Sequence, residues 1–160
     1  MPRGDFSLNY IDFNLVNDTE YLVDDKLLLS CAEKVLEEEL PGKRAELNLL
    51  LCDDEVMQNY NRIFRGDNSV TDVLCFNYYD SILDTEDEAF PSPYCDIIID
   101  IKQLERQKGN KSMEDELIEV FIHGLLHALG YDHIRLEDRT VMEEKEKYYI
   151  NKIVGDKTSG

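Results

Sequence analysis

The sequence contains no apolar run that approaches the roughly 18–20 residues of a membrane span, so we expect no transmembrane helix. Its first residues, Met-Pro-Arg-Gly-Asp-Phe-Ser, include no apolar segment of the kind found in secretory signals, and we therefore expect a cytoplasmic protein. Cysteine pairs with metal-binding spacing are also missing. The four cysteines lie twenty or more residues apart, which favours reduced, mostly buried thiols over disulfides or zinc ligands; they are Cys31, Cys52, Cys75 and Cys95.

Basic residues are scarce. Seventeen Lys and Arg stand against thirty-five Asp and Glu, which gives a formal net charge of −18. Such a charge favours solubility and repels polyanions at long range, so a nucleic-acid partner would have to be recognised by a local patch. A length of 160 residues, with 42% hydrophobic and 9% aromatic residues, is typical of one globular domain, which we predict over residues 1–160.

Apolar periodicity predicts a mixture of strands and helices. Alternating patterns favour strands over residues 8–16, 47–51, 71–78 and 94–101, and helical spacing favours helices over 24–40, 54–64, 112–129 and 136–154. The acidic stretch 79–93 is predicted to be a loop, either solvated or acting as a lid or partner contact. These elements predict an α+β domain with a small, mostly four-stranded mixed sheet packed with helices, one of them central.

All three histidines fall within eleven residues, at His123, His127 and His133. The first two are four residues apart and would share one face of a helix. The third follows Gly130, which can take the left-handed conformation that ends a helix. Three neutral imidazoles can hold a transition metal, zinc by ligand type, and leave one position open for water. We therefore predict a zincin-like metal helix and a hydrolytic activity, although separately satisfied core or surface histidines are the alternative.

The spacing of the three histidines, with Gly130 between the last two, also matches the metzincin protease motif H-E-x-x-H-x-x-G-x-x-H. Peptide hydrolysis at such sites depends on the glutamate after the first histidine, and this chain has Gly124 there. Glycine inside a helix costs about 1 kcal/mol relative to alanine, so we expect it to make room for another backbone or a bulky substrate. Without the carboxylate, the peptidase interpretation is disfavoured.

Three blocks of sequence resemble the YbeY family, bacterial single-strand-specific endoribonucleases needed for ribosomal RNA maturation. The resemblance covers roughly residues 45–135 and is strongest in the histidine block, His123-Gly-x-Leu-His127-x-x-Gly130-Tyr131-Asp132-His133. The other two blocks are Asn61-x-x-Phe64-Arg65 with Thr71-Asp72-Val73-Leu74-Cys75-Phe76, and Asp96-Ile97-Ile98-Ile99. Four positions depart from the family pattern without touching a predicted metal ligand. Cys75 and Asn77 replace a serine and a proline, and Cys95 and Asp100 replace a glycine and a serine.

The resemblance implies a metal-dependent endoribonuclease that acts on single-stranded RNA, in maturation of the 16S ribosomal RNA 3′ end and in ribosome quality control. It implies catalytic roles for Arg65 and His123, and a guanidinium suits this task because it pairs bidentately with phosphate. The expected cofactor is one Zn²⁺ or another divalent transition metal per chain. Ribosomal proteins or other ribosome-assembly factors are possible further partners, whereas membranes and DNA are not expected.

Two weaker sets of residues complete the prediction. One basic stretch leads into the predicted metal helix and could follow an RNA backbone, or it could be a solvated amphipathic face; it contains Lys102, Arg106, Lys108 and Lys111. Asp72 and Asp132 are candidates to orient a metal-binding imidazole. The main alternative function is a metal-stabilised, ribosome-associated binding module, which the acidic surface would suit; a metzincin-like peptidase is less favoured.

Overall fold

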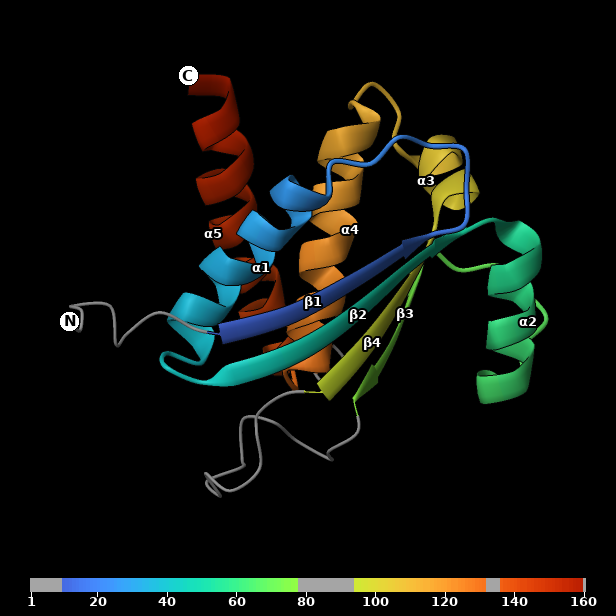
Figure 1. Cartoon of the computed structure of the whole chain (residues 1–160), viewed down its shortest axis with the longest axis horizontal. Coiled ribbons are helices and arrows are strands. Elements are labelled where there is room, and N and C mark those ends of the chain that lie inside the picture. The colour runs from blue at the N-terminus through green and yellow to red at the C-terminus, as the bar shows by residue number, and fades with distance from the viewer. Residues whose placement is uncertain (1–9, 78–93, 132–135, 160) are drawn as a thin grey trace.

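The sheet is built from β1 (Tyr10–Asn17), β2 (Arg44–Cys52), β3 (Val73–Asn77) and β4 (Tyr94–Asp100). The strands lie in the order β1-β2-β4-β3, with β1, β2 and β4 parallel and β3 antiparallel to β4 at one edge. The computed structural model describes residues 10–77, 94–131 and 136–159, drawn as the coloured ribbon in Figure 1. The predicted α+β domain with a four-stranded mixed sheet is confirmed, while the predicted loop 79–93 lies outside the described residues.

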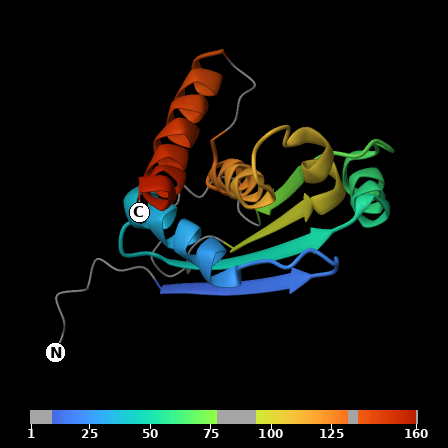
Figure 2. The ribbon, with the colours of Figure 1, turned by 90° about the horizontal axis from the view of Figure 1, so that it is seen from above.

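Five helices accompany the sheet: α1 (Asp25–Glu39), α2 (Asp54–Arg65), α3 (Ile101–Gln107), α4 (Met113–Ala128) and α5 (Leu136–Ser159). Helices α1, α4 and α5 lie on one face, as Figure 2 shows from above, and α2 packs on the other. Within the described ranges, no helix combines the length and apolarity needed to cross a membrane.

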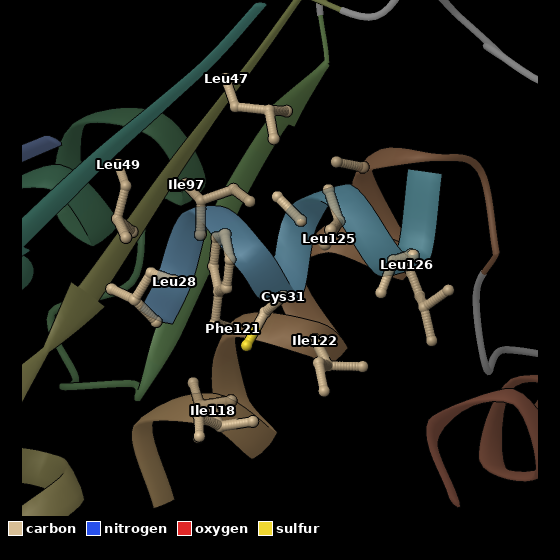
Figure 3. Close-up of a cluster of buried hydrophobic side chains, with 14 of the residues drawn as sticks. Leu28, Cys31, Leu47, Leu49, Ile97, Ile118, Phe121, Ile122, Leu125 and Leu126 are labelled. Atoms are coloured by element: carbon tan, nitrogen blue, oxygen red, sulfur yellow. The ribbon is translucent and has the colours of Figure 1, made fainter. Parts of the chain in front are cut away.

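Successive side chains of a strand point to opposite faces of the sheet, so neighbouring residues contact different helices. Leu49 and Ile97 are opposite each other in β2 and β4 and face α1 and α4, where they join Phe121 in the main core (Figure 3). Ile98, one residue along β4, instead joins Met57 of α2 in a smaller cluster on the opposite face. The apolar residues of the strands and helices therefore form two hydrophobic cores, one on each face of the sheet.

Helix α3 was not predicted from the sequence, because the apolar run of the fourth strand continues to Ile101 and the residues after it stand out only as a basic stretch. The strand ends at Asp100, whose buried carboxylate accepts hydrogen bonds from the backbone amides of Lys102 (3.0 Å) and Gln103 (3.3 Å). Serine, the family residue at this position, is likewise a favoured N-cap. The departure at Asp100 therefore retains a residue that starts α3.

Helix α5 is attached to α1 through Glu39, whose side chain is only 4% exposed. Its carboxylate accepts hydrogen bonds from the hydroxyl groups of Tyr131 (2.6 Å) and Tyr149, and Lys145 forms an ion pair with it at 3.0 Å. Burial alone would raise the pKa of Glu39, but the bonds from Tyr131, Tyr149 and Lys145 outweigh it and lower the pKa below its ordinary value of 4.5.

We predict that Glu39→Gln lowers the free energy of unfolding by about 1–3 kcal/mol, because it leaves buried partners of a carboxylate incompletely satisfied. Since the folded pKa of Glu39 lies below the unfolded one, its contribution is fully present above pH 4.5 and is lost as the pH falls through the folded pKa. Urea unfolding at several pH values measures this. The difference between the wild type and the variant should be constant from about pH 6 to 8 and shrink below about pH 4.5.

Glu38 provides the matched control. Its side chain is 35% exposed and contacts Tyr148 and Lys152 of α5 in the same way, at 2.7 and 2.5 Å. Exposed ion pairs contribute about 0–1 kcal/mol, so Glu38→Gln should cost distinctly less than Glu39→Gln. Equal losses from the two variants would mean that burial of Glu39 does not set its contribution.

Candidate active site

Helix α4 carries the first two histidines of the predicted cluster. Ser112 caps the start of this helix by accepting a hydrogen bond from the amide of Asp115 at 3.1 Å. Most of the side chains of the helix are apolar and buried. His123 and His127 lie on its less buried side, with ring centroids 4.9 Å apart and an interplanar angle of 72°. The four-residue spacing thus places two imidazoles side by side on one helix face.

The chain turns where α4 ends, as the sequence predicts. Gly130 has a φ of 111°, and its amide donates to the carbonyl of His127 at 3.0 Å. The next residue, Tyr131, is tied back by its amide to Leu126 at 3.1 Å. The predicted third ligand His133 and the predicted orienting residue Asp132 lie outside the described residues. In the ranges that are described, no three His, Cys, Asp or Glu side chains are grouped to hold a metal.

A cavity of about 400 Å³ opens beside the two histidines, between α4 and the edge strand β3. Arg65, at the last position of α2, contributes to the same cavity, although fifty-eight residues separate it from His123. The lining residues come from four segments and are Arg65, Thr71, Asp72, Val73, Cys75, Asn77, His123, His127 and Ala128. The structure therefore brings together two predicted ligands and the predicted phosphate-binding arginine.

The end of α2 places Arg65 at this edge. Gly66 takes the left-handed conformation with φ 68° and stops the helix. The buried Asn61 then holds the following loop, because its side-chain amide donates to the carbonyl of Ser69 at 2.8 Å. This loop leads to Thr71 and Asp72 in the cavity wall. The role of Asn61 in the sequence block that contains Phe64 and Arg65 is therefore structural, because it fixes the loop after α2.

Two departures from the family pattern attach β3 to α4. The thiol of Cys75 donates to the carbonyl of Gly124 at 3.2 Å, and the amide of Asn77 donates to the carbonyl of Ala128 at 3.0 Å.

Burial raises the pKa of Cys75, and likewise of Cys95 and Cys52, to about 12. Metals bind thiolates, so these neutral thiols are poor ligands, and the prediction of free, mostly buried cysteines is confirmed.

Gly124 packs against the sheet. A Cβ at this position would lie 3.1 Å from Val73 Cγ2, 3.2 Å from Ile97 Cγ2 and 3.3 Å from Cys75 Sγ. The neighbours are side chains of β3 and β4, so the expectation that glycine admits another backbone or a substrate is wrong. The position that holds the catalytic glutamate in metzincins is here filled by the core.

Glu146 is a residue next to the site that was not predicted from the sequence. It lies on α5, and its carboxylate contacts Nδ1 of His123. Burial alone would lower the pKa of His123, but the hydrogen bond and charge of Glu146, with a further contribution from Asp72, raise it above its ordinary value. Glu146 is one of several acids on a strongly charged helix, so no local pattern distinguishes it.

The predicted orienting residue Asp72 lines the cavity, and its carboxylate accepts a hydrogen bond from the side chain of Gln107 at 3.0 Å. Gln107 also donates to Glu116 of α4 at 2.8 Å. Asp72 therefore links β3 to α3 and α4 at the margin of the site. A role for it in orienting an imidazole stays a prediction.

None of the four predicted basic residues of the stretch 102–111 lines this cavity. Arg106 binds both oxygens of Asp54, at 2.9 and 2.7 Å, and this bond is the main cause of a pKa of about 2 for Asp54. Lys111 pairs with Glu116 at 2.5 Å and Glu119 at 3.1 Å. The remaining two are Lys102, 3.7 Å from Glu105, and Lys108, which donates to backbone carbonyls.

The chain is similar to known proteins in sequence and in fold. The chain matches the family Endoribonuclease YbeY over residues 14–154. A relative of that name from Fusobacterium nucleatum is 39% identical over 145 residues, covering 87% of this chain and 86% of the relative. Another, from Neorickettsia sennetsu, is 34% identical and covers 86% and 94%. A solution structure of a protein from Thermotoga maritima superposes with a TM-score of 0.63 at 27% identity, covering 92% of each chain.

We predict that Gly124→Leu lowers the free energy of unfolding by about 1–3 kcal/mol, because the new side chain has no space against the sheet. Gly155 in α5 is the matched control, since nothing lies within 4 Å of a Cβ built there. Gly155→Leu should instead leave the protein unchanged or stabilise it by up to about 1 kcal/mol, through helix propensity alone. Urea unfolding compares the two, and equal effects would show that α4 does not lie so close to β3 and β4.

Proposed function

The chain belongs to the endoribonuclease YbeY family, and on this premise we propose that it is a metal-dependent endoribonuclease that hydrolyses single-stranded RNA in the cavity between α4 and β3. The observation that carries the proposal is the meeting of His123, His127 and Arg65 in that one cavity. These residues offer the two chemistries that phosphodiester hydrolysis requires, nitrogen donors for a metal and a fixed cation for a phosphate.

We propose His123, His127 and His133 as the ligands of one divalent ion, with zinc favoured by the nitrogen donors. The donor set fits such an ion. Two imidazoles lie side by side at the cavity, and Glu146 contacts Nδ1 of His123, an arrangement in which Nε2 would be the metal-binding nitrogen. When bound, the ion would polarise a phosphoryl oxygen and lower the pKa of a bound water.

We assign Arg65 to the RNA phosphate. Its guanidinium remains charged at any relevant pH and can hold two phosphate oxygens at once. It projects from the end of α2 into the cavity wall, so a phosphate that it held would lie beside the two histidines. With a net charge of −18, the protein has little other attraction for RNA, and this contact should carry much of the binding.

The biological substrate that we propose is ribosomal RNA, with maturation of the 16S 3′ end and ribosome quality control as the processes served. Support comes from the family resemblance of the histidine and arginine blocks. The acidic charge of the chain would suit basic ribosomal proteins or other assembly factors as docking partners, in a cytoplasmic setting. The same charge favours the alternative of a binding module with a structural metal, which the experiments below separate from the nuclease by measuring cleavage as well as metal content.

We predict that His127→Ala and His133→Ala each lose most of the bound zinc and all measurable cleavage of an unstructured RNA oligonucleotide, because two imidazoles alone form a weak site. Metal content after dialysis against a mild chelator, together with an RNA gel assay, measures both effects. Full metal occupancy in either variant would show that the residue is not a ligand. A wild type that holds zinc without cutting RNA would instead favour the binding module, and chelator-sensitive cleavage of casein with RNA left intact would favour the peptidase.

Arg65→Ala and Arg65→Lys should both fold, retain zinc and lose RNA cleavage by at least about tenfold, as expected for a charge-assisted hydrogen bond of roughly 1.5–3 kcal/mol. Lysine should substitute poorly because it lacks the two-pronged geometry. Arg62→Ala is the matched control, since Arg62 is exposed on the same helix and does not line the cavity. Cleavage that survives in Arg65→Ala at moderate salt would exclude Arg65 from the site and favour the stretch 102–111 as the phosphate contact.

A further inference from the structure

Nδ1 of His123 contacts the carboxylate of Glu146, which lies on a different helix and twenty-three residues further along the chain. We propose that Glu146 is a positioning residue, which holds His123 as the Nδ1–H tautomer and thereby directs the lone pair of Nε2 into the cavity. The inference rests on the proposed function, because it gives that lone pair a use as a metal ligand. It adds a residue outside the three sequence blocks to the candidate site.

The chemistry follows from the two nitrogens of imidazole. A neutral ring carries one N–H donor and one lone pair, and the hydrogen bond made by one nitrogen decides what the other offers. A carboxylate accepts hydrogen bonds and donates none, so Glu146 selects the proton on Nδ1. Histidines that bind metals commonly donate their second nitrogen to a carboxylate in this way, which orients the ring and increases the basicity of the ligand.

Burial strengthens the contact. The side chains of Glu146 and His123 are 22% and 35% exposed, so solvent competes only in part for this hydrogen bond. Asp72 is a carboxylate that lines the cavity itself, and its side chain accepts a hydrogen bond from Gln107. Glu146, by contrast, contacts the His123 ring directly at Nδ1.

Neighbouring residues of α5 hold Glu146 in place. The preceding residue, Lys145, pairs with the buried Glu39, and Tyr149 one turn later donates to the same carboxylate. Met142 and Tyr149 are also buried in the main core. The orientation of α5 is therefore set by contacts with α1 and the core, and Glu146 meets His123 as a consequence.

The test uses the full-length protein with Glu146→Ala, Glu146→Gln and the control Glu144→Gln. Glu144 is an exposed acid of the same helix that lines the groove beside Glu38 and Glu39, so its variant removes the same charge away from His123. Competition with a chromogenic chelator measures zinc affinity. Glu146→Ala should bind zinc about 10–100-fold more weakly. Glu146→Gln should recover part of the loss, because its amide oxygen still accepts from Nδ1–H, and Glu144→Gln should match the wild type.

A second measurement needs no metal. Nitrogen-15 chemical shifts of the His123 ring in the metal-free protein, at a pH where the ring is neutral, should report the Nδ1–H tautomer in the wild type. Glu146→Ala should shift the population toward Nε2–H. A wild-type ring already in the Nε2–H form would overturn the inference even if the alanine variant failed to fold.

The two proposals fail in different ways. If His127→Ala abolishes zinc binding while Glu146→Ala leaves the affinity unchanged, the metal site stands and the role of Glu146 is wrong. If the wild type binds no zinc but shows the Nδ1–H tautomer, which is lost in Glu146→Ala, Glu146 does position His123 and the proposed metal function is wrong.

Discussion

The close packing of α4 against the sheet at Gly124 determines where the rest of the candidate site lies. Methyl groups of Val73 and Ile97 come within 3.1 and 3.2 Å of the point where a Cβ would stand, so the helix backbone at Gly124 rests directly on side chains of β3 and β4. With this position against the sheet, the preceding His123 lies at the edge of the contact, next to the cavity. Hydrogen bonds from Cys75 and Asn77 to carbonyls of α4 fix the same approach at two points.

Helix α5 connects this arrangement to the remainder of the core. Two consecutive residues contact two different helices, because Lys145 pairs with Glu39 of α1 and Glu146 contacts His123 of α4. Tyr131, which follows the turn at the end of α4, donates to the same Glu39. The chain therefore leaves α4 toward Asp132 and His133 from an anchored residue. A change in the α1–α5 contact should affect both the stability of the fold and the geometry around His123.

The fold was largely predictable because its signals are local. Strand alternation, helical spacing, and the cap at Ser112 predict the elements to within a few residues, and the Asp-capped α3 was missed because seven residues carry too little periodicity. Site residues were predictable only where they lie close together in a sequence motif, as His123 and His127 do. Glu146 was not, because its role arises from contact between two helices. Gly124 was singled out correctly, but its neighbours depend on the register of β3 against β4.

The acidic net charge is compatible with the proposed RNA substrate, because salt weakens the interaction between charges that are far apart. At physiological ionic strength, charges farther apart than about 8 Å are largely screened, so most of the −18 charge lies too far from a phosphate in the cavity to act strongly on it. Short-range contacts then decide binding, and much of the basic stretch 102–111 is occupied by its own acids, as Arg106 is by Asp54. Arg65 is the basic side chain that lines the cavity in the described part of the chain. The acidic surface would thus disfavour non-specific contact with RNA elsewhere on the protein, and only a strand flexible enough to place a phosphate between Arg65 and the histidines would gain from binding.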